Sequence, residues 1–167
     1  MIKEISYIAK PKNKKAKSVM LGLLGSSIIL VAAATWTPKY SGIVWVFALA
    51  FITATIYVYN RYVGAEYVYE IIDPSRPSFV IGMRVGKTAR TMARLDLYAV
   101  KEIRRLTKEE YRKYKPEKGI LKYPYYPTMF SDEIYLLSVR SDYENADIFI
   151  EADSEFIAAL DESIKGM

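Results

Sequence analysis

The stretch SVMLGLLGSSIILVAAATWTPKYSGIVWVFALAFITATIYVYN, residues 18–60, decides the fold of this chain, because Lys39 is its only charged residue. Residues 18–38 and residues 40–60 form two uncharged runs of 21 residues each. At 1.5 Å per residue, each run makes about 30 Å of helix, which matches the hydrocarbon thickness of a bilayer. Pro38 and Gly42 interrupt the helical pattern between the runs. The pattern therefore predicts a two-helix transmembrane hairpin, with helices at about 18–37 and 41–60.

The lysines on either side of this hairpin predict its orientation. Residues 1–17 form a basic tail with six lysines and one glutamate, whereas the loop between the helices has only Lys39. The positive-inside rule then places both termini in the cytoplasm, for a multi-pass protein of the cell membrane. The expected membrane-surface contacts are Lys12, Lys14, Lys15, Lys17 and Arg61, and the expected interface aromatics are Trp36, Tyr40, Trp45, Tyr57 and Tyr59.

A cleaved signal peptide is the alternative interpretation of the first apolar run. Residues 32–34, Ala-Ala-Ala, resemble a cleavage site. The apolar run is longer than a usual signal-peptide core, and a second run follows at once. A retained hairpin is therefore the favoured interpretation.

The composition excludes several classes of chemistry. The 167 residues include no cysteine and no histidine. Disulfides, zinc sites built from Cys and His, and His-based triads or dyads are therefore excluded. The best remaining acidic cluster is Asp142, Glu144 and Asp147, which has the pattern of a hairpin turn and lacks the glycine of a calcium loop. We expect no catalytic residue, no metal site and no cofactor.

The positive charge lies mainly outside the C-terminal part of the chain. The net charge is +5, but residues 61–167 carry 17 basic and 18 acidic groups. This balance gives no indication of nucleic-acid binding. Within it, residues 76–122 have a net charge of +9 and residues 123–167 a net charge of −8. If the two segments lie on separate faces of the domain, their charges form a strong dipole. If strands of the two segments are antiparallel neighbours, their opposite charges mix and neutralise one another.

After residue 60 the sequence predicts a cytoplasmic domain of six or seven antiparallel strands followed by one amphipathic helix. The strand candidates are rich in β-branched and aromatic residues and are divided by turn residues. They are EYVYEII (66–72), SFVIGMRV (78–85), ARTMARL (89–95), AVKEIRRL (99–106), DEIYLLSVR (132–140) and ADIFIEA (146–152). The segment SEFIAALDESIKG (154–166) has a plausible N-cap at Asp153 or Ser154 and a stop at Gly166.

This order resembles the bacterial pleckstrin-homology-like (PH-like) domain proteins that carry N-terminal transmembrane helices. The resemblance rests on YVYEI (67–71), ARLDLYAVKEI (93–103) and IFIEADSEFIAALDESI (148–164). It implies an α+β membrane protein in which a helical hairpin precedes a small PH-like antiparallel β-sandwich or barrel, over residues 61–167, with a C-terminal helix. It also implies a binding or scaffolding module, although the function of such a fold must be argued from its site.

Residues 107–131 form an insert that a minimal domain of this kind does not need. Thr107 and Glu110 match a capping box, which predicts a short helix that ends before Pro116. Tyrosines and prolines alternate from residue 123 to residue 127 and argue against regular structure there. These tyrosines suit either a membrane interface or partner, or packing on the sandwich.

The stretch GMRVGKT, residues 82–88, resembles a phosphate-binding P-loop. Only three residues separate its glycines, where a P-loop needs four, and no helix is expected after it. We therefore expect a β-hairpin and no nucleotide. A three-residue loop, residues 86–88, pairs Val85 with Ala89 and sorts apolar from charged side chains. It also sets Arg84 opposite Arg90, which favours an anion between them.

The predicted anion- or lipid-binding residues are Arg84, Lys87, Arg90 and Arg94. The predicted partners are membrane lipids, among them lipids with anionic headgroups, and a membrane protein. The predicted function is that of a membrane-anchored, non-enzymatic cytoplasmic module that binds lipid headgroups or a protein at the membrane surface. The alternative is an accessory or structural subunit of a larger membrane complex.

Overall fold

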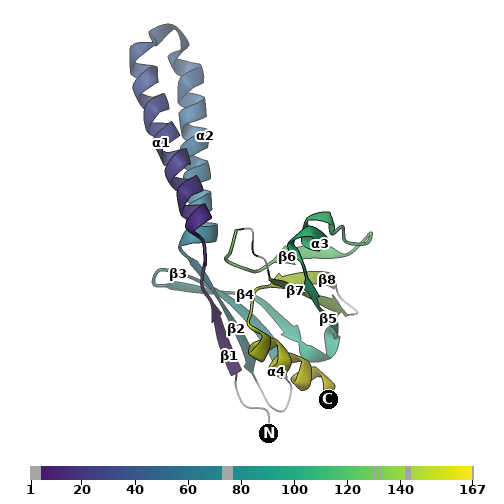
Figure 1. Cartoon of the computed structure of the whole chain (residues 1–167). Coiled ribbons are helices and arrows are strands. Elements are labelled where there is room, and N and C mark those ends of the chain that lie inside the picture. Colours follow the sequence, from purple (N-terminus) through teal and green to yellow (C-terminus); the bar gives the residue numbers. More distant parts are fainter. Residues whose placement is uncertain (1–4, 73–76, 130, 132, 142–143, 167) are drawn as a thin grey trace.

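A long helical hairpin projects from a small β-sandwich (Figure 1). This computed structural model describes residues 5–72, 77–129, 131, 133–141 and 144–166. The hairpin consists of α1 (Lys14–Trp36), the short 3-10 helix η1 (Pro38–Tyr40), α2 (Ser41–Val58) and the single π-turn η2 (Tyr59–Val63). By length and composition the segments Lys14–Trp36 and Pro38–Val63 can cross a membrane.

The hairpin is inserted between two neighbouring strands of the first sheet. This sheet has the order β1-β2-β3-β4 and is antiparallel throughout, with strands β1 (Ile5–Ala9), β2 (Ala65–Ile72), β3 (Ser78–Val85) and β4 (Thr88–Asp96). Strand β1 lies in the segment that the sequence assigned to a basic tail, of which residues 1–4 lie outside the described residues. Tyr7 of β1 pairs with Tyr69 of β2, so both ends of the hairpin belong to one sheet.

The second sheet has the order β5-β7-β8-β6, with strands β5 (Val100–Leu106), β6 (Leu121–Pro124), β7 (Ile134–Arg140) and β8 (Asn145–Ile150). Strand β6 runs parallel to β8, whereas the other pairs are antiparallel. Because β6 includes Tyr123 and Pro124, the expectation of irregular structure is wrong for these two residues, whereas residues 125–127 belong to no helix or strand, as predicted. Pro124 is tolerated since it ends an edge strand, where a missing N–H breaks no interior ladder.

The core lies between the two sheets and under the C-terminal helix α4 (Ser154–Lys165). The 3-10 turn η3 (Leu97–Ala99) carries the chain from β4 to β5, which correspond to the strands predicted at 89–95 and 99–106. Asp153 caps α4 by accepting a hydrogen bond from the Phe156 N–H at 2.8 Å, which confirms the predicted cap. Phe156 and Leu160 of this helix are buried against both sheets.

The insert covers the outer face of the second sheet. It begins with α3 (Lys108–Lys113), whose predicted Thr107–Glu110 capping box is confirmed. A second apolar cluster forms beneath it, from Leu106, Tyr126, Ile134, Leu136 and Phe149. Tyr111 and Tyr114 pack edge-on against the ring of Phe149 at centroid distances of 5.1 and 5.3 Å. Tyr111 of α3 and Tyr114, which directly follows this helix, therefore contribute to the structure of the domain.

The β3–β4 hairpin corrects the predicted register. Its loop has two residues, Gly86 and Lys87, so that Val85 pairs with Thr88. A bulge after Ile81 absorbs one extra residue of β4, and the pair Ile81–Ala93 then has the register expected for a three-residue loop. The predicted register is therefore right at the end of the hairpin away from the turn and wrong at the turn itself. The bulge causes this difference, because it shifts one half of a hairpin against the other. Gly86 has a φ of +59°, as primed two-residue turns require.

Candidate functional site

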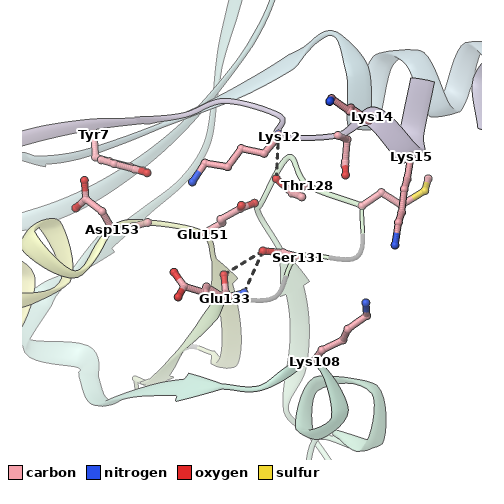
Figure 2. A pocket seen from close by; sticks show the side chains of 13 residues that line it. Tyr7, Lys12, Lys14, Lys15, Lys108, Thr128, Ser131, Glu133, Glu151 and Asp153 are labelled. Atoms are coloured by element: carbon pink, nitrogen blue, oxygen red, sulfur yellow. Dashed lines mark hydrogen bonds between the residues drawn. The ribbon is translucent and has the colours of Figure 1, made fainter. Parts of the chain in front are cut away.

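A cavity of about 530 Å³ opens where the chain leaves β1 and enters α1 (Figure 2). Its walls come from residues 12–15, from Thr128, Met129, Ser131 and Glu133, and from the segment that follows β8. Its charged lining residues are Lys12, Lys14, Lys15, Lys108, Glu133, Glu151 and Asp153. Three of the five lysines between residues 10 and 17, at the base of the hairpin, line this cavity.

The basic end of the cavity is formed by the start of α1. Lys14 and Lys15 lie in the first turn of that helix, and both are exposed. Lys12 precedes them, and its backbone N–H donates a hydrogen bond to the Thr128 hydroxyl at 3.5 Å. Three of the lysines predicted to contact the membrane surface thus line one cavity, whereas Lys17 is exposed and does not line it.

The other end of the cavity contains a buried carboxylate. Glu151 exposes 8% of its surface, and its Oε2 atom has no hydrogen-bond partner in the described part of the chain. Burial raises the pKa of the Glu151 carboxyl, while hydrogen bonds from Thr128 and Ser131 and the charge of Lys12 act in the opposite direction. A buried carboxyl oxygen without a donor is uncommon, because each such group loses its hydration without replacement.

Tyr69 fixes the backbone of Glu151 from the first sheet. The hydroxyl of Tyr69 accepts a hydrogen bond from the Glu151 N–H at 3.3 Å and donates one to the carbonyl of Tyr125 at 2.6 Å. The ring of Tyr69 is fully buried and is stacked with that of Tyr7 at 6.2 Å. Glu151 is therefore held on a packed part of the core.

Tyr7 and Asp153 complete the acidic end. Burial raises the pKa of the Tyr7 hydroxyl, and the nearby carboxylates of Asp153 and Glu151 raise it further. Figure 2 shows Tyr7, Asp153 and Glu151 on the side of β1 and α4, with Lys14 and Lys15 on the side of α1. The side chain of Lys12 extends from the α1 side into the acidic end, where its amine lies between Tyr7 and Glu151. The cavity is thus polarised, with its basic end next to the hairpin.

The arginines predicted to bind an anion lie away from this cavity, on the β3–β4 hairpin. Arg84 pairs with Ala89 across the ladder and forms an ion pair with Glu66 of β2, with Nε 3.0 Å from Oε2. The expected Arg84–Arg90 pair is therefore wrong, because the two-residue loop shifts the register by one. Arg94 donates a hydrogen bond to the Ser78 hydroxyl at 3.2 Å. Anion binding by Arg84, Lys87, Arg90 and Arg94 stays a prediction.

Arg61, predicted as a membrane-surface contact, uses its guanidinium group within the domain. It lies over the rings of Tyr62, Tyr67 and Tyr126, at 5.4, 5.3 and 5.9 Å from the centroids. It also donates to the Tyr67 hydroxyl and to the Pro124 carbonyl. These contacts join the end of the helical hairpin to the sandwich.

The aromatic residues predicted for the membrane interfaces are all exposed on the hairpin. Trp36 and Tyr40 lie at the loop end, with 86% and 57% of their surface exposed. The other three are Trp45, Tyr57 and Tyr59, of which the last two lie near the sandwich.

The tyrosines between residues 123 and 126 pack on the sandwich. Tyr126 is buried and donates a hydrogen bond to the Tyr111 hydroxyl at 2.7 Å. Tyr123 and Tyr125 are stacked at 5.7 Å, and the Tyr123 hydroxyl donates to Glu144 at 2.8 Å. Of the two interpretations of this insert, these contacts favour packing.

The acidic cluster considered for catalysis does not form a site among the described residues. Asp142 lies outside them, and Asp147 is fully buried in an ion pair with Arg140 at 3.0 Å. Burial and a hydrogen bond to Asp147 raise the pKa of Tyr114 to about 12. In the described ranges no group of three acidic residues could hold a metal ion.

Sequence reasoning missed Glu151, Thr128, Ser131 and Lys108 as parts of one cavity. A signal was present for Glu151, since it is the one charged residue at the end of the apolar run IFIEA. Its neighbours in the cavity come from the insert, about 20 residues earlier, and from the segment before α1. Local sequence patterns do not predict contacts between segments so far apart in the chain.

A family model described as a bacterial PH-like domain (DUF6106) matches residues 6–166, which includes both sheets, the hairpin and α4. No curated protein matches the chain.

Proposed function

We propose a function for this chain, which belongs to the family of bacterial PH-like domains. It is a membrane-anchored, non-enzymatic module that binds phospholipid headgroups. The lysines of the cavity at the base of the hairpin would hold the phosphate. The hairpin would keep the cavity at the membrane surface.

The surface of the hairpin supports insertion into a bilayer. Large apolar side chains point outward along both helices, among them Ile29 with 70% and Leu49 with 59% of their surface exposed. In water this exposure costs roughly 25 cal/mol per Å² of apolar surface, and a bilayer removes the cost. A helix also satisfies its own backbone hydrogen bonds, as a membrane span must.

The lysine distribution supports a cytoplasmic domain. Both ends of the hairpin enter the first sheet, so the sandwich and both ends of the spans lie on one side of any membrane that the hairpin crosses. That side carries the lysines of residues 10–17, whereas the loop has Lys39. The positive-inside rule assigns such a side to the cytoplasm.

The observation that carries the proposal is the position of Lys14 and Lys15. They are the first residues of α1 and also line the cavity. A lysine at the end of a membrane helix extends its amine to the headgroup level. Each lysine near an anionic surface contributes about 1 kcal/mol of attraction, and both of these residues line the same cavity. The phosphate of a lipid beside α1 can therefore reach the cavity without leaving the membrane.

Lipid retention tests this function. The full chain is reconstituted in nanodiscs of mixed phospholipids, released into detergent, and weighed by native mass spectrometry with its bound lipids. We expect the unaltered chain to retain phospholipid and the double variant K14Q/K15Q to lose it. The control K10Q/K17Q removes the same charge from lysines outside the cavity lining and should retain lipid. Equal retention by both double variants would refute a role for the cavity.

A second candidate is an accessory subunit of a membrane complex. It is favoured by a groove on the hairpin, lined by Ser26, Ile29, Leu30, Phe47 and Phe51, which an apolar helix of a partner would fill. Purification from native membranes in mild detergent distinguishes the two functions. A partner that co-purifies in fixed ratio, and is lost from F47A/F51A, would favour the subunit function.

A further inference from the structure

We infer that the lysine-rich cavity selects a headgroup with a primary ammonium beside its phosphate, so that its ligand is phosphatidylethanolamine of the surrounding membrane. The phosphate lies at Lys14 and Lys15, and the ammonium donates to the unpaired Oε2 of Glu151. This inference rests on the proposed function and adds the chemical identity of the headgroup.

The unpaired oxygen is the first observation behind this inference. Glu151 lines the cavity and exposes 8% of its surface, and its buried Oε2 atom has no donor from any described residue. The groups around this carboxylate are Lys12, Thr128, Ser131, Tyr7 and Asp153. Tyr7 and Asp153 cannot supply a positive charge, and Lys12 supplies charge but no hydrogen bond to Oε2. A buried carboxylate oxygen in such a place calls for a further donor, and a cationic donor stabilises it most.

The polarity of the cavity is the second observation. Its basic end adjoins the first turn of α1, and its carboxylates lie toward β1 and the N-terminus of α4 (Figure 2). A phospholipid beside α1 has the same order, since its phosphate lies nearer the acyl chains than its terminal group does. An ethanolamine headgroup therefore matches lysine with phosphate and carboxylate with ammonium in one orientation.

Other common headgroups fit only part of the cavity. A choline group carries positive charge but has no N–H to donate. A glycerol group has hydroxyl donors but no charge, and charge-assisted hydrogen bonds are roughly twice as strong as neutral ones. A bare phosphate monoester satisfies the lysines and leaves Oε2 unpaired. We therefore expect the order of preference ethanolamine, then glycerol, then choline.

The test uses the full chain in nanodiscs with equal amounts of phosphatidylethanolamine, phosphatidylglycerol and phosphatidylcholine. Native mass spectrometry reports which lipid the released chain retains. The ethanolamine lipid should be enriched about tenfold over the choline lipid, as expected for a difference of one charge-assisted hydrogen bond. In Glu151→Gln this enrichment should vanish while total retention persists. The matched control Glu133→Gln changes a cavity carboxylate that is 58% exposed and should keep the enrichment.

The outcomes separate the two levels of the proposal. If the unaltered chain retains no lipid, the proposed function fails together with this inference. If it retains lipid without favouring ethanolamine, or if Glu151→Gln keeps the enrichment, this inference alone is overturned. The comparison of ethanolamine with choline on the unaltered chain needs no variant to fold.

Soluble phosphoethanolamine shares the same chemistry, and a separate arm distinguishes it from the lipid. The chain in nanodiscs without ethanolamine lipid is titrated with O-phosphoethanolamine and followed by tyrosine fluorescence. We expect at most weak, millimolar binding. Micromolar binding that depends on Glu151, without enrichment of the lipid, would overturn the assignment to a membrane lipid.

Discussion

The hydroxyl of Tyr69, in the middle of the first sheet, accepts a hydrogen bond from the backbone N–H of Glu151 at 3.3 Å. The two residues are 82 positions apart, and Glu151 directly follows the last strand of the second sheet. Because the same hydroxyl donates to the carbonyl of Tyr125, one buried oxygen joins the first sheet, the insert and the backbone of Glu151. The position of Glu151 thus depends on the packing of the whole sandwich.

Replacing Tyr69 with phenylalanine tests this link. The change removes one oxygen and leaves the Glu151 N–H and the Tyr125 carbonyl without this partner in a buried place. Buried groups left unpaired cost about 1–3 kcal/mol each, so the loss of two partners should lower the free energy of unfolding by about 2–6 kcal/mol. Denaturant titration of the full chain in detergent measures it. Tyr98→Phe changes a ring that is 57% exposed and should leave stability unchanged.

The buried Glu151 carboxyl should make stability depend on pH. Its pKa in the folded chain lies above the ordinary value of 4.5, so the folded chain holds its proton more tightly than the unfolded chain does. The group therefore contributes stability at low pH that is lost as pH rises through the folded-state pKa. In melting experiments from pH 4 to pH 7, Glu151→Gln should gain stability relative to the unaltered chain as pH rises.

Glu133→Gln is the control for this pH dependence, because its carboxylate is exposed and faces Arg105. Both variants are measured over the same pH range, and only Glu151→Gln alters a buried carboxyl. A difference from the unaltered chain that stays constant with pH for Glu151→Gln would mean that the buried carboxyl does not titrate with unfolding.

Local patterns were sufficient to predict the elements that depend on near neighbours. The two apolar runs, the Thr107–Glu110 capping box and the Asp153 cap are all set within a few residues. Strand β1 was missed because its five residues make a strand only through pairing with β2, across the whole hairpin. The cavity was missed for the same reason, since Glu151 and Lys14 meet only after both sheets have formed. The bulge at Ile81 is likewise a property of two strands together.

The turn of the β3–β4 hairpin can be tested with two glycines of the same strand pair. Gly86 has a φ of +59°, which strains any residue with a Cβ, so Gly86→Ala should lower the free energy of unfolding by about 1 kcal/mol. Gly82 lies beside the bulge, and a Cβ there meets the carbonyl oxygens of Val68 and Arg90 at 3.7 and 3.8 Å, which is ordinary contact. Gly82→Ala should therefore be tolerated. A reversed order of the two costs would contradict the two-residue turn.

The ion pairs of the second sheet should differ strongly in their contributions. Asp147 is fully buried against Arg140, whereas the Arg105–Glu133 pair is more than half exposed on both sides. Removing one member of a buried pair leaves an uncompensated charge and costs about 3–5 kcal/mol, so Arg140→Met should destabilise the domain by that order. Arg105→Met should cost less than about 1 kcal/mol. Denaturant titration of both variants compares them directly.

The absence of cysteine makes the orientation of the hairpin directly measurable, because one introduced cysteine is the sole label site. Lys39→Cys lies in the loop at the far end of the hairpin, and Glu162→Cys lies on the exposed side of α4. In intact cells a membrane-impermeant maleimide should modify the first and spare the second, because the positive-inside rule keeps the lysine-rich side in the cytoplasm. After lysis both should react. Modification of Glu162→Cys alone in intact cells would reverse the orientation, and modification of neither before lysis would show that the loop does not reach the outer surface.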